Sequence, residues 1–195
     1  HLAGKATPED LGWVRIVVCF AAIIYVLSED TTSVSLLPLE LRNFNAMGVM
    51  PYLYRLPVGL EHLAQSRLGL QILKSAALIF LFFGLVGFKT RFVIPLAFLG
   101  YFILGGIHRE FTHFFHSGLL PIYLLAVLSV TPCADGLSLD RFIAVRKESR
   151  RVYPSRLSRR YGYARFACWS VFALTYFFVG LSKFRNGGFY WWNAQ

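Results

Sequence analysis

The chain has 195 residues, of which 56% are hydrophobic and only 15% are charged. A soluble domain is about 45–50% apolar and about 25% charged, so this composition excludes most soluble classes and also a disordered chain. In a soluble protein the formal net charge of +10 would indicate a nucleic-acid partner. In a membrane protein the first explanation is that Lys and Arg gather in the loops on one side of the membrane. We therefore expect the lipid bilayer as the main partner and no nucleic acid.

Five apolar stretches are candidates for membrane spans, since roughly 20 helical residues cross the hydrocarbon core of about 30 Å. Lipid leaves a backbone N–H or C=O without a partner, and the stretches lack two-residue alternation, so helices are favoured over a barrel. The sequence thus predicts an all-α integral membrane protein with one domain over 1–195 and a bundle of about five transmembrane helices, at about 11–27, 68–88, 92–107, 114–130 and 163–183. The third and fourth stretches are close enough in sequence to form a tight helical hairpin.

Basic residues set the predicted orientation. The side with the N-terminus, the 89–91 turn and the 131–162 loop carries eleven Lys and Arg residues, against five on the other side. The positive-inside rule places the richer side in the cytoplasm, with 131–162 as a cytoplasmic basic loop. The end of the chain after Lys183 is then lumenal or periplasmic. Residues 29–67 are too polar to span and predict one or two short amphipathic helices on the outer surface.

Ionisable residues inside spans mark functional or structural hydrogen bonding. Arg15 and Arg165 lie near the cytoplasmic ends of their spans, so snorkelling is favoured for both. Lys74 is expected either to snorkel or to pair with Glu110. The three cysteines, Cys19, Cys133 and Cys168, lie far apart and are interpreted as small buried hydrophobes.

Lys183 closes the fifth stretch on the same outer face as three histidines, His108, His113 and His116. A lysine held partly out of water can act as a general base, although a lysine at a helix end is more often an interface anchor. Because Glu110 is the single further ligand nearby, we expect no metal, and the histidines fit hydrogen bonding at a cavity mouth better.

Four segments carry a family resemblance. They are, in order, EDLGWVR (9–15), HSGLL from His116, SLD (138–140) and YFFVGLSKF (176–184). With these segments the chain resembles the membrane domain of vitamin K-dependent gamma-carboxylase and its bacterial relatives, the horizontally transferred transmembrane domain (HTTM) proteins. The last segment is the most specific of the four.

The resemblance implies a carboxylase-like membrane enzyme, classed as a lyase, that works with reduced vitamin K or a related quinone. In the family, a lysine at the position of Lys183 is the base that deprotonates the reduced quinone, and a histidine at the position of His116 assists on the glutamate-facing side. Lys183 and His116 would then be catalytic residues at the outer mouth of an apolar, quinone-sized cavity.

The chain departs from the family pattern at several positions. Ser182 precedes Lys183 where the family has paired lysines, Arg185 replaces an acidic residue, and Phe114 and Phe115 replace asparagines. These departures keep a second hypothesis open, a non-catalytic HTTM-fold subunit of a larger membrane complex that docks through the aromatic segment GGFYWWN (187–193). A transporter or channel is a third and weaker hypothesis, because few polar residues fall at the midplane.

Overall fold

The computed structural model describes residues 4–36, 50–55, 59–111, 118–147 and 157–187. Within these ranges the chain is helical and no β-strand is named, which confirms the all-α prediction. The elements are α1 (Pro8–Ser28), η1 (Ser33–Leu36), α3 (Met50–Tyr54), α4 (Leu60–Gln65), α5 (Arg67–Val86), α6 (Thr90–Phe111), α7 (Leu119–Val130), α8 (Leu139–Lys147) and α9 (Arg159–Gly187). Four of them, α1, α5, α6 and α9, are long and apolar enough to cross a membrane.

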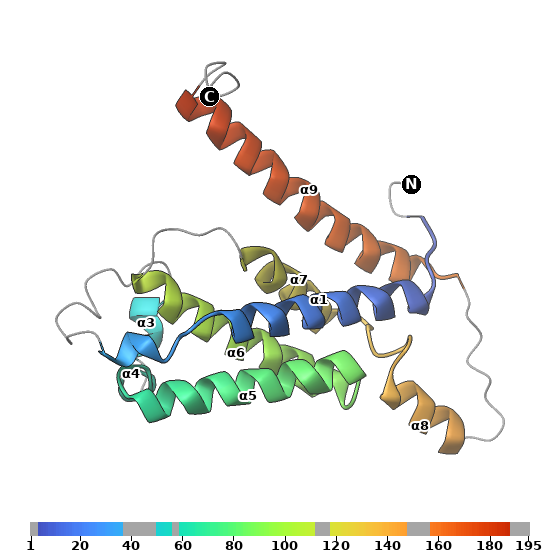
Figure 1. Ribbon diagram of the computed structural model, residues 1–195. Coiled ribbons are helices and arrows are strands. Elements are labelled where there is room, and N and C mark those ends of the chain that lie inside the picture. The colour runs from blue at the N-terminus through green and yellow to red at the C-terminus, as the bar shows by residue number, and fades with distance from the viewer. Residues whose placement is uncertain (1–3, 37–49, 56–58, 112–117, 148–156, 188–195) are drawn as a thin grey trace.

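The helices α1, α5, α6 and α7 pack into one bundle, in which α6 contacts both α5 and α7 (Figure 1). The contact between α6 and α7 agrees with the hairpin expected for the third and fourth apolar stretches. The core contains Leu11, Leu81, Ile94, Tyr101 and Leu125, all nearly inaccessible to solvent. In contrast, α9 contacts α1 and α7 with its N-terminal part and then diverges from the bundle (Figure 1).

Local sequence signals explain where the long helices begin and end. Pro8 opens α1 after a capping box, in which Thr7 and Asp10 each accept a hydrogen bond from the other's backbone N–H. The Ser66 side chain caps the start of α5 by accepting from the backbone of Gly69. At its other end α5 stops at Gly87, which has a φ of +79° in the left-handed region that favours glycine.

The fourth apolar stretch forms a shorter helix than expected. The sequence predicts a span from about residue 114 to 130, but α7 has 12 residues and begins at Leu119. At about 1.5 Å per residue, α7 is only about 18 Å long and does not reach across the hydrocarbon core. Gly118 accounts for the late start, because its φ of +83° is incompatible with a right-handed helix running through it. A fifth full span is therefore not confirmed, and residues 114–117 of the predicted span lie outside the described residues.

The segment from 29 to 67 contains η1, α3 and α4 in its described parts, while residues 37–49 and 56–58 lie outside them. Met50 and Ala64 of these short helices are buried against Leu70 of α5 and Ile107 of α6. This second, smaller core fixes the segment beside the ends of α5 and α6. Its location on an outer membrane surface stays a prediction.

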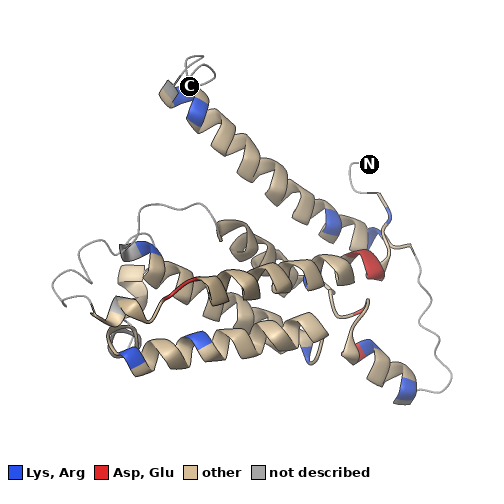
Figure 2. Ribbon diagram, in the orientation of Figure 1, with Lys and Arg blue, Asp and Glu red and all other residues tan. Residues whose placement is uncertain are grey.

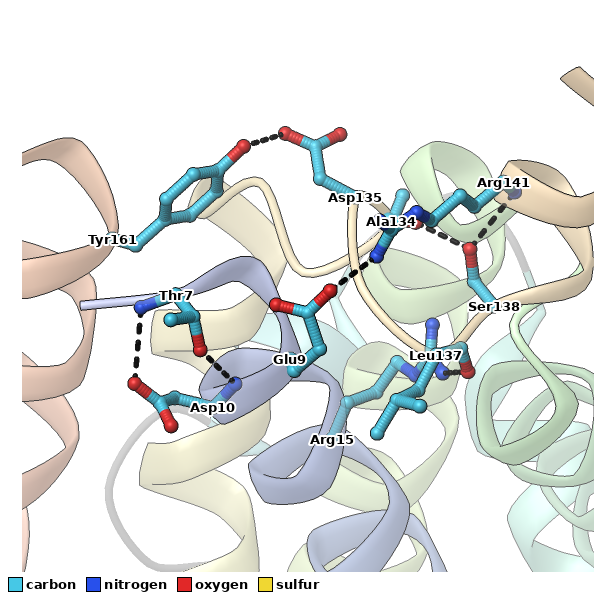
Figure 3. Close-up of polar contacts among 10 residues, drawn as sticks. All are labelled: Thr7, Glu9, Asp10, Arg15, Ala134, Asp135, Leu137, Ser138, Arg141 and Tyr161. Atoms are coloured by element: carbon cyan, nitrogen blue, oxygen red, sulfur yellow. Dashed lines mark hydrogen bonds and ion pairs between the residues drawn. The ribbon is translucent and has the colours of Figure 1, made fainter. Parts of the chain in front are cut away.

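One end of the bundle, here named the basic end, is formed by residues 4–12, 87–91, 131–147 and 157–165. Arg15 lies at its centre with no solvent-exposed surface. Its guanidinium donates to the backbone carbonyl of Cys133 at 3.3 Å and to that of Leu137 at 2.6 Å, the second of which is drawn in Figure 3. Arg15 therefore does not snorkel as predicted, because the turn after α7 folds over it and supplies acceptors in place of water.

Asp140 joins two further segments at the basic end. Its carboxylate accepts from the backbone N–H groups of Lys89, at 2.7 Å, and Thr90, at 2.8 Å, and also from the Thr90 hydroxyl. The first N–H groups of a helix have no partner within that helix. Asp140 thus caps α6 from a position 50 residues further along the chain, and so ties the start of α8 to the turn between α5 and α6.

Side-chain pairs complete the basic end. They are Arg165–Asp10 at 3.3 Å, and Arg141–Glu9 at 2.6 Å and Tyr161–Asp135 at 2.7 Å, of which the last two are drawn in Figure 3. Together with Arg15 and Asp140, these pairs bring residues 4–12, the 89–91 turn, 131–147 and 157–162 to the same end of the molecule. The sequence groups these segments on one side from charge alone, and their described parts do lie together. The side of the membrane that they occupy stays a prediction.

All three cysteines are buried and unbonded to one another, as the sequence predicts. Burial in apolar surroundings disfavours the thiolate. For Cys133, which lies beyond the end of α7, burial raises the pKa of the thiol to about 11.

Replacing Arg15 tests whether the basic end depends on its guanidinium. We expect Arg15→Met to lower the free energy of unfolding by about 2–4 kcal/mol, because two carbonyls lose charged donors while still enclosed. Arg165→Met is the matched control and should cost less than about 1 kcal/mol, since its ion pair is exposed. Thermal unfolding in mild detergent measures both, and equal losses would contradict the central role of Arg15.

The cysteines provide a second test of the packing. At pH 8 the native thiols should react slowly with iodoacetamide, since burial blocks access and keeps the Cys133 thiol protonated. An exposed reference thiol introduced as Lys5→Cys should react fast, and all sites should react after denaturation in SDS. Mass measurement counts the labels, and labelling of native thiols at the Lys5→Cys rate would show that the core is open.

Candidate functional site

A cavity of about 720 Å³ lies between α7 and the diverging part of α9. Apolar side chains make up most of its walls, and the polar groups are the side chains of Tyr123, Thr175, Ser182 and Lys183. The Thr175 hydroxyl donates to the carbonyl of Val171 within its own helix. The lining residues are Leu119, Tyr123, Ala126 and Val127 from α7, and Val171, Leu174, Thr175, Phe178, Val179, Ser182 and Lys183 from α9. A ligand bound in this cavity would contact mainly apolar side chains, with the Lys183 amine at one end.

Lys183 lies at the rim of this cavity, in the last turns of α9. The sequence predicts a lysine held partly out of water, but the protein atoms leave Lys183 exposed. Cys168 is the last buried residue of α9 among those that the structure describes, and the turns after it diverge from the bundle (Figure 1).

The predicted partner of Lys183 cannot be placed, since His116 and His113 both lie outside the described residues. The described chain resumes at Gly118, and Leu119 lines the cavity. The backbone that follows His116 by three residues is therefore at the cavity wall. Proximity between His116 and Lys183 stays a prediction.

Two of the other candidate residues belong to a separate cluster around Glu29, at the end of α1. His108 Nε2 lies 2.9 Å from Glu29 Oε2, and the Lys74 amine donates to the Glu29 backbone carbonyl at 2.7 Å. Lys74 thus takes an acceptor that the sequence did not suggest, and the side chain of its expected partner Glu110 lies outside the described part. Sequence reasoning missed Glu29 as a candidate, although it is the first acidic residue after the first apolar stretch and faces the same end as His108.

Tyrosines connect this cluster to the beginning of α7. The Tyr101 hydroxyl donates to the carbonyl of Gly118 at 3.2 Å, and its ring meets the edge of Tyr25 at a centroid distance of 5.9 Å. Gly118 also lies directly against the Tyr25 ring, where a Cβ at position 118 would be only 2.6 Å from the ring carbon Cζ. Both α1 and α6 therefore fix the point at which α7, and hence one wall of the cavity, begins.

Within the described ranges, no group of three or more His, Cys, Asp or Glu side chains is arranged to hold a metal ion. Two of the three outer histidines are outside those ranges, so the expectation of a site without metal stays a prediction. The polar groups that do line the cavity are a lysine, two hydroxyl-bearing aliphatic residues and a tyrosine.

Comparison with known proteins gives no relative for this chain. No protein-family model matches it, and neither a curated protein nor a solved structure does. The site is therefore interpreted from its own geometry, together with the sequence resemblance.

Gly118 offers a test of how the cavity wall is positioned. Gly118→Ala should destabilise the protein through both a strained positive φ, which costs roughly 1–2 kcal/mol, and a clash with Tyr25. Gly59→Ala is the matched control, because Gly59 also has a positive φ of 68° but no atom within 4 Å of where its Cβ would lie. The larger loss at position 118 should shrink in a Tyr25→Leu background, as measured by a double-mutant cycle of thermal unfolding. Equal losses at both glycines would show that the Tyr25 contact is unimportant.

Proposed function

We propose that the chain is a carboxylase-like integral membrane enzyme that acts with a reduced quinone of the vitamin K type. In this proposal Lys183 is the base and His116 its partner, and the quinone binds in the cavity between α7 and α9. The observation that supports it most directly is an apolar cavity of about 720 Å³ with Lys183 at its rim. Cavities of about 300–1,000 Å³ with apolar walls and a few polar groups are typical of small-molecule sites.

The cavity residues fit such a ligand in polarity as well as in size. Val127, Leu174 and Phe178 offer the apolar surface that a fused aromatic ring and its hydrocarbon tail require. When bound, the reduced quinone would supply the acidic hydroxyl and the reducing equivalents. A ring seated against these walls would exclude water around Lys183, and the neutral amine that a base needs is favoured where water is excluded.

The proposed orientation places the basic end in the cytoplasm and the cavity mouth at Lys183 on the lumenal or periplasmic side. Support comes from the eleven basic residues that the sequence assigns to the first side against five on the other. An enzyme arranged in this way would draw its quinone from the bilayer and meet its second substrate outside the cytoplasm.

Purified protein in detergent should oxidise a reduced naphthoquinone with molecular oxygen as the oxidant, and Lys183→Ala should abolish this activity while leaving thermal unfolding unchanged. Arg185→Gln is the matched control, since Arg185 is an exposed cation on the same helix that does not line the cavity. It should retain turnover. Equal turnover by the Lys183→Ala variant would refute the catalytic assignment.

Quinone binding needs its own measurement, because loss of turnover alone does not locate the ligand. Ala126→Trp should fill part of the cavity from the α7 side and weaken binding of a naphthoquinone, measured by quenching of protein fluorescence with correction for the added tryptophan. Unchanged affinity would place the quinone elsewhere.

A second candidate function is that of a non-catalytic subunit of a larger membrane complex. The observation that favours it is the exposure of α9, where 11% of the most apolar window is buried, against 28–44% in the other three span-length helices. Large side chains such as Tyr176, Phe177 and Phe178 are all at least 60% exposed. Extraction in a gentle detergent followed by mass measurement distinguishes the candidates, since stable co-purifying subunits favour the complex and a lone chain of 22.2 kDa contradicts it.

A further inference from the structure

The basic end contains a second cavity, of about 450 Å³, that has no part in the proposed reaction. It lies between the start of α6, the turn that follows α7 and the start of α9, and its lining is more polar than apolar. The lining residues are Thr90, Arg91, the stretch from Leu128 to Asp135, and Arg160. Two arginines from separate helices thus face one polar hollow at the end of the bundle.

These two arginines differ from the neighbouring arginines in whether they form ion pairs. Arg141 and Arg165 form ion pairs with Glu9 and Asp10. Among the described residues, neither Arg91 nor Arg160 forms an ion pair. Figure 2 shows Lys and Arg at the beginning of α9, along α8 and near the turn between α5 and α6, together with acidic residues at the starts of α1 and α8. The two cavity arginines are therefore available to an external anion.

The other charged and polar groups of the cavity do not neutralise the two arginines. Asp135 is the one acidic residue in the lining, and its carboxylate accepts a hydrogen bond from Tyr161. The hydroxyls of Ser129 and Thr131 donate to the backbone carbonyls of Leu125 and Leu128. The described lining, with two arginines and one aspartate, therefore has a formal charge of +1 and presents guanidinium groups as its principal donors.

The cavity also has an apolar edge, formed by Val130 at the end of α7. Val130 is 86% exposed, which is the largest value among the large hydrophobic residues of the described chain. An exposed valine at the end of an apolar helix, beside a pair of arginines, matches the level at which acyl chains meet headgroups in a bilayer. A ligand with a phosphate and a hydrocarbon chain would satisfy both parts.

We propose that this cavity binds the phosphate of an anionic phospholipid between Arg91 and Arg160, with the acyl chains lying along Val130. Guanidinium groups bind phosphate oxygens through paired, charge-assisted hydrogen bonds. A lipid bound here would bridge the starts of α6 and α9, two elements that Asp140 and Asp10 tie down separately. The site would thus stabilise the attachment of α9 to the bundle.

The test uses the intact chain in phosphatidylcholine nanodiscs, with phosphatidylglycerol as the added probe. Phosphatidylglycerol should raise the thermal midpoint of the wild-type protein, and native mass spectrometry should detect one retained lipid. The Arg91→Gln/Arg160→Gln double variant should bind phosphatidylglycerol at least about tenfold more weakly, a loss equivalent to about 1.4 kcal/mol. Unfolding in phosphatidylcholine alone shows whether this variant is folded; if it is not, the two single variants are compared in the same way.

A matched control removes the same charge from the same end of the molecule. Arg146 and Arg159 are exposed and do not line the cavity. The Arg146→Gln/Arg159→Gln variant should keep the wild-type affinity within about twofold, since only a diffuse attraction is lost. Equal losses of phosphatidylglycerol affinity in both double variants would show that the lipid is attracted by the overall positive charge of this end, and would overturn the proposed site. Equal stabilisation by excess inorganic phosphate without lipid would show a free-anion site and overturn the assignment to a phospholipid.

Discussion

The structure depends on one buried cation. Arg15 is enclosed at the centre of the basic end, and its two hydrogen bonds attach the turn after α7 to α1. Enclosing a guanidinium away from water is costly unless acceptors replace the lost solvent. The carbonyls of Cys133 and Leu137 meet that requirement for the two terminal nitrogens of Arg15, while its Nε is buried without an acceptor. These carbonyls reach Arg15 only if the chain folds back over α1. The charge of Arg15 in α1 thus specifies the path of the chain at Cys133 and Leu137, which follow Arg15 by 118 and 122 positions.

The same end shows how close packing and polar contacts reinforce each other. A Cβ at Gly12 would lie 2.7 Å from the carbonyl oxygen of Gly136, and one at Gly87 would lie 2.5 Å from the Arg15 guanidinium. Larger residues at either position would push the turn away from α1 and lengthen the hydrogen bonds to Arg15. The small residues at the ends of α1 and α5 and in the turn after α7 are therefore part of the same constraint as the arginine.

Sequence reasoning predicted the helical class, the approximate positions of four span-length helices and the grouping of the basic segments. Those features follow from hydrophobicity and charge, which are local properties. Sequence reasoning wrongly predicted that Arg15 snorkels, because a position near the end of a span does not show whether a distant turn will cover the side chain. For the fourth stretch it did not predict that α7 begins only at Leu119, because Gly118 adopts a positive φ and hydrophobicity does not report backbone conformation. Lys183 does lie beside an apolar cavity, yet its exposure follows from the direction of α9, which no local pattern encodes.

Among the described residues, those of α9 that are buried lie between Gly162 and Cys168, which has a mechanical consequence. From Gly162 to Lys183 the helix extends about 32 Å at about 1.5 Å per residue. A rotation of about 10° about Gly162 would therefore displace Lys183 by about 5.5 Å. The fulcrum lies at Tyr161 and Gly162, whose neighbours are held by Asp10, Asp135 and the chain near Gly4. A change in the contacts at the basic end would therefore also change the distance between α7 and the turns of α9 that carry Lys183.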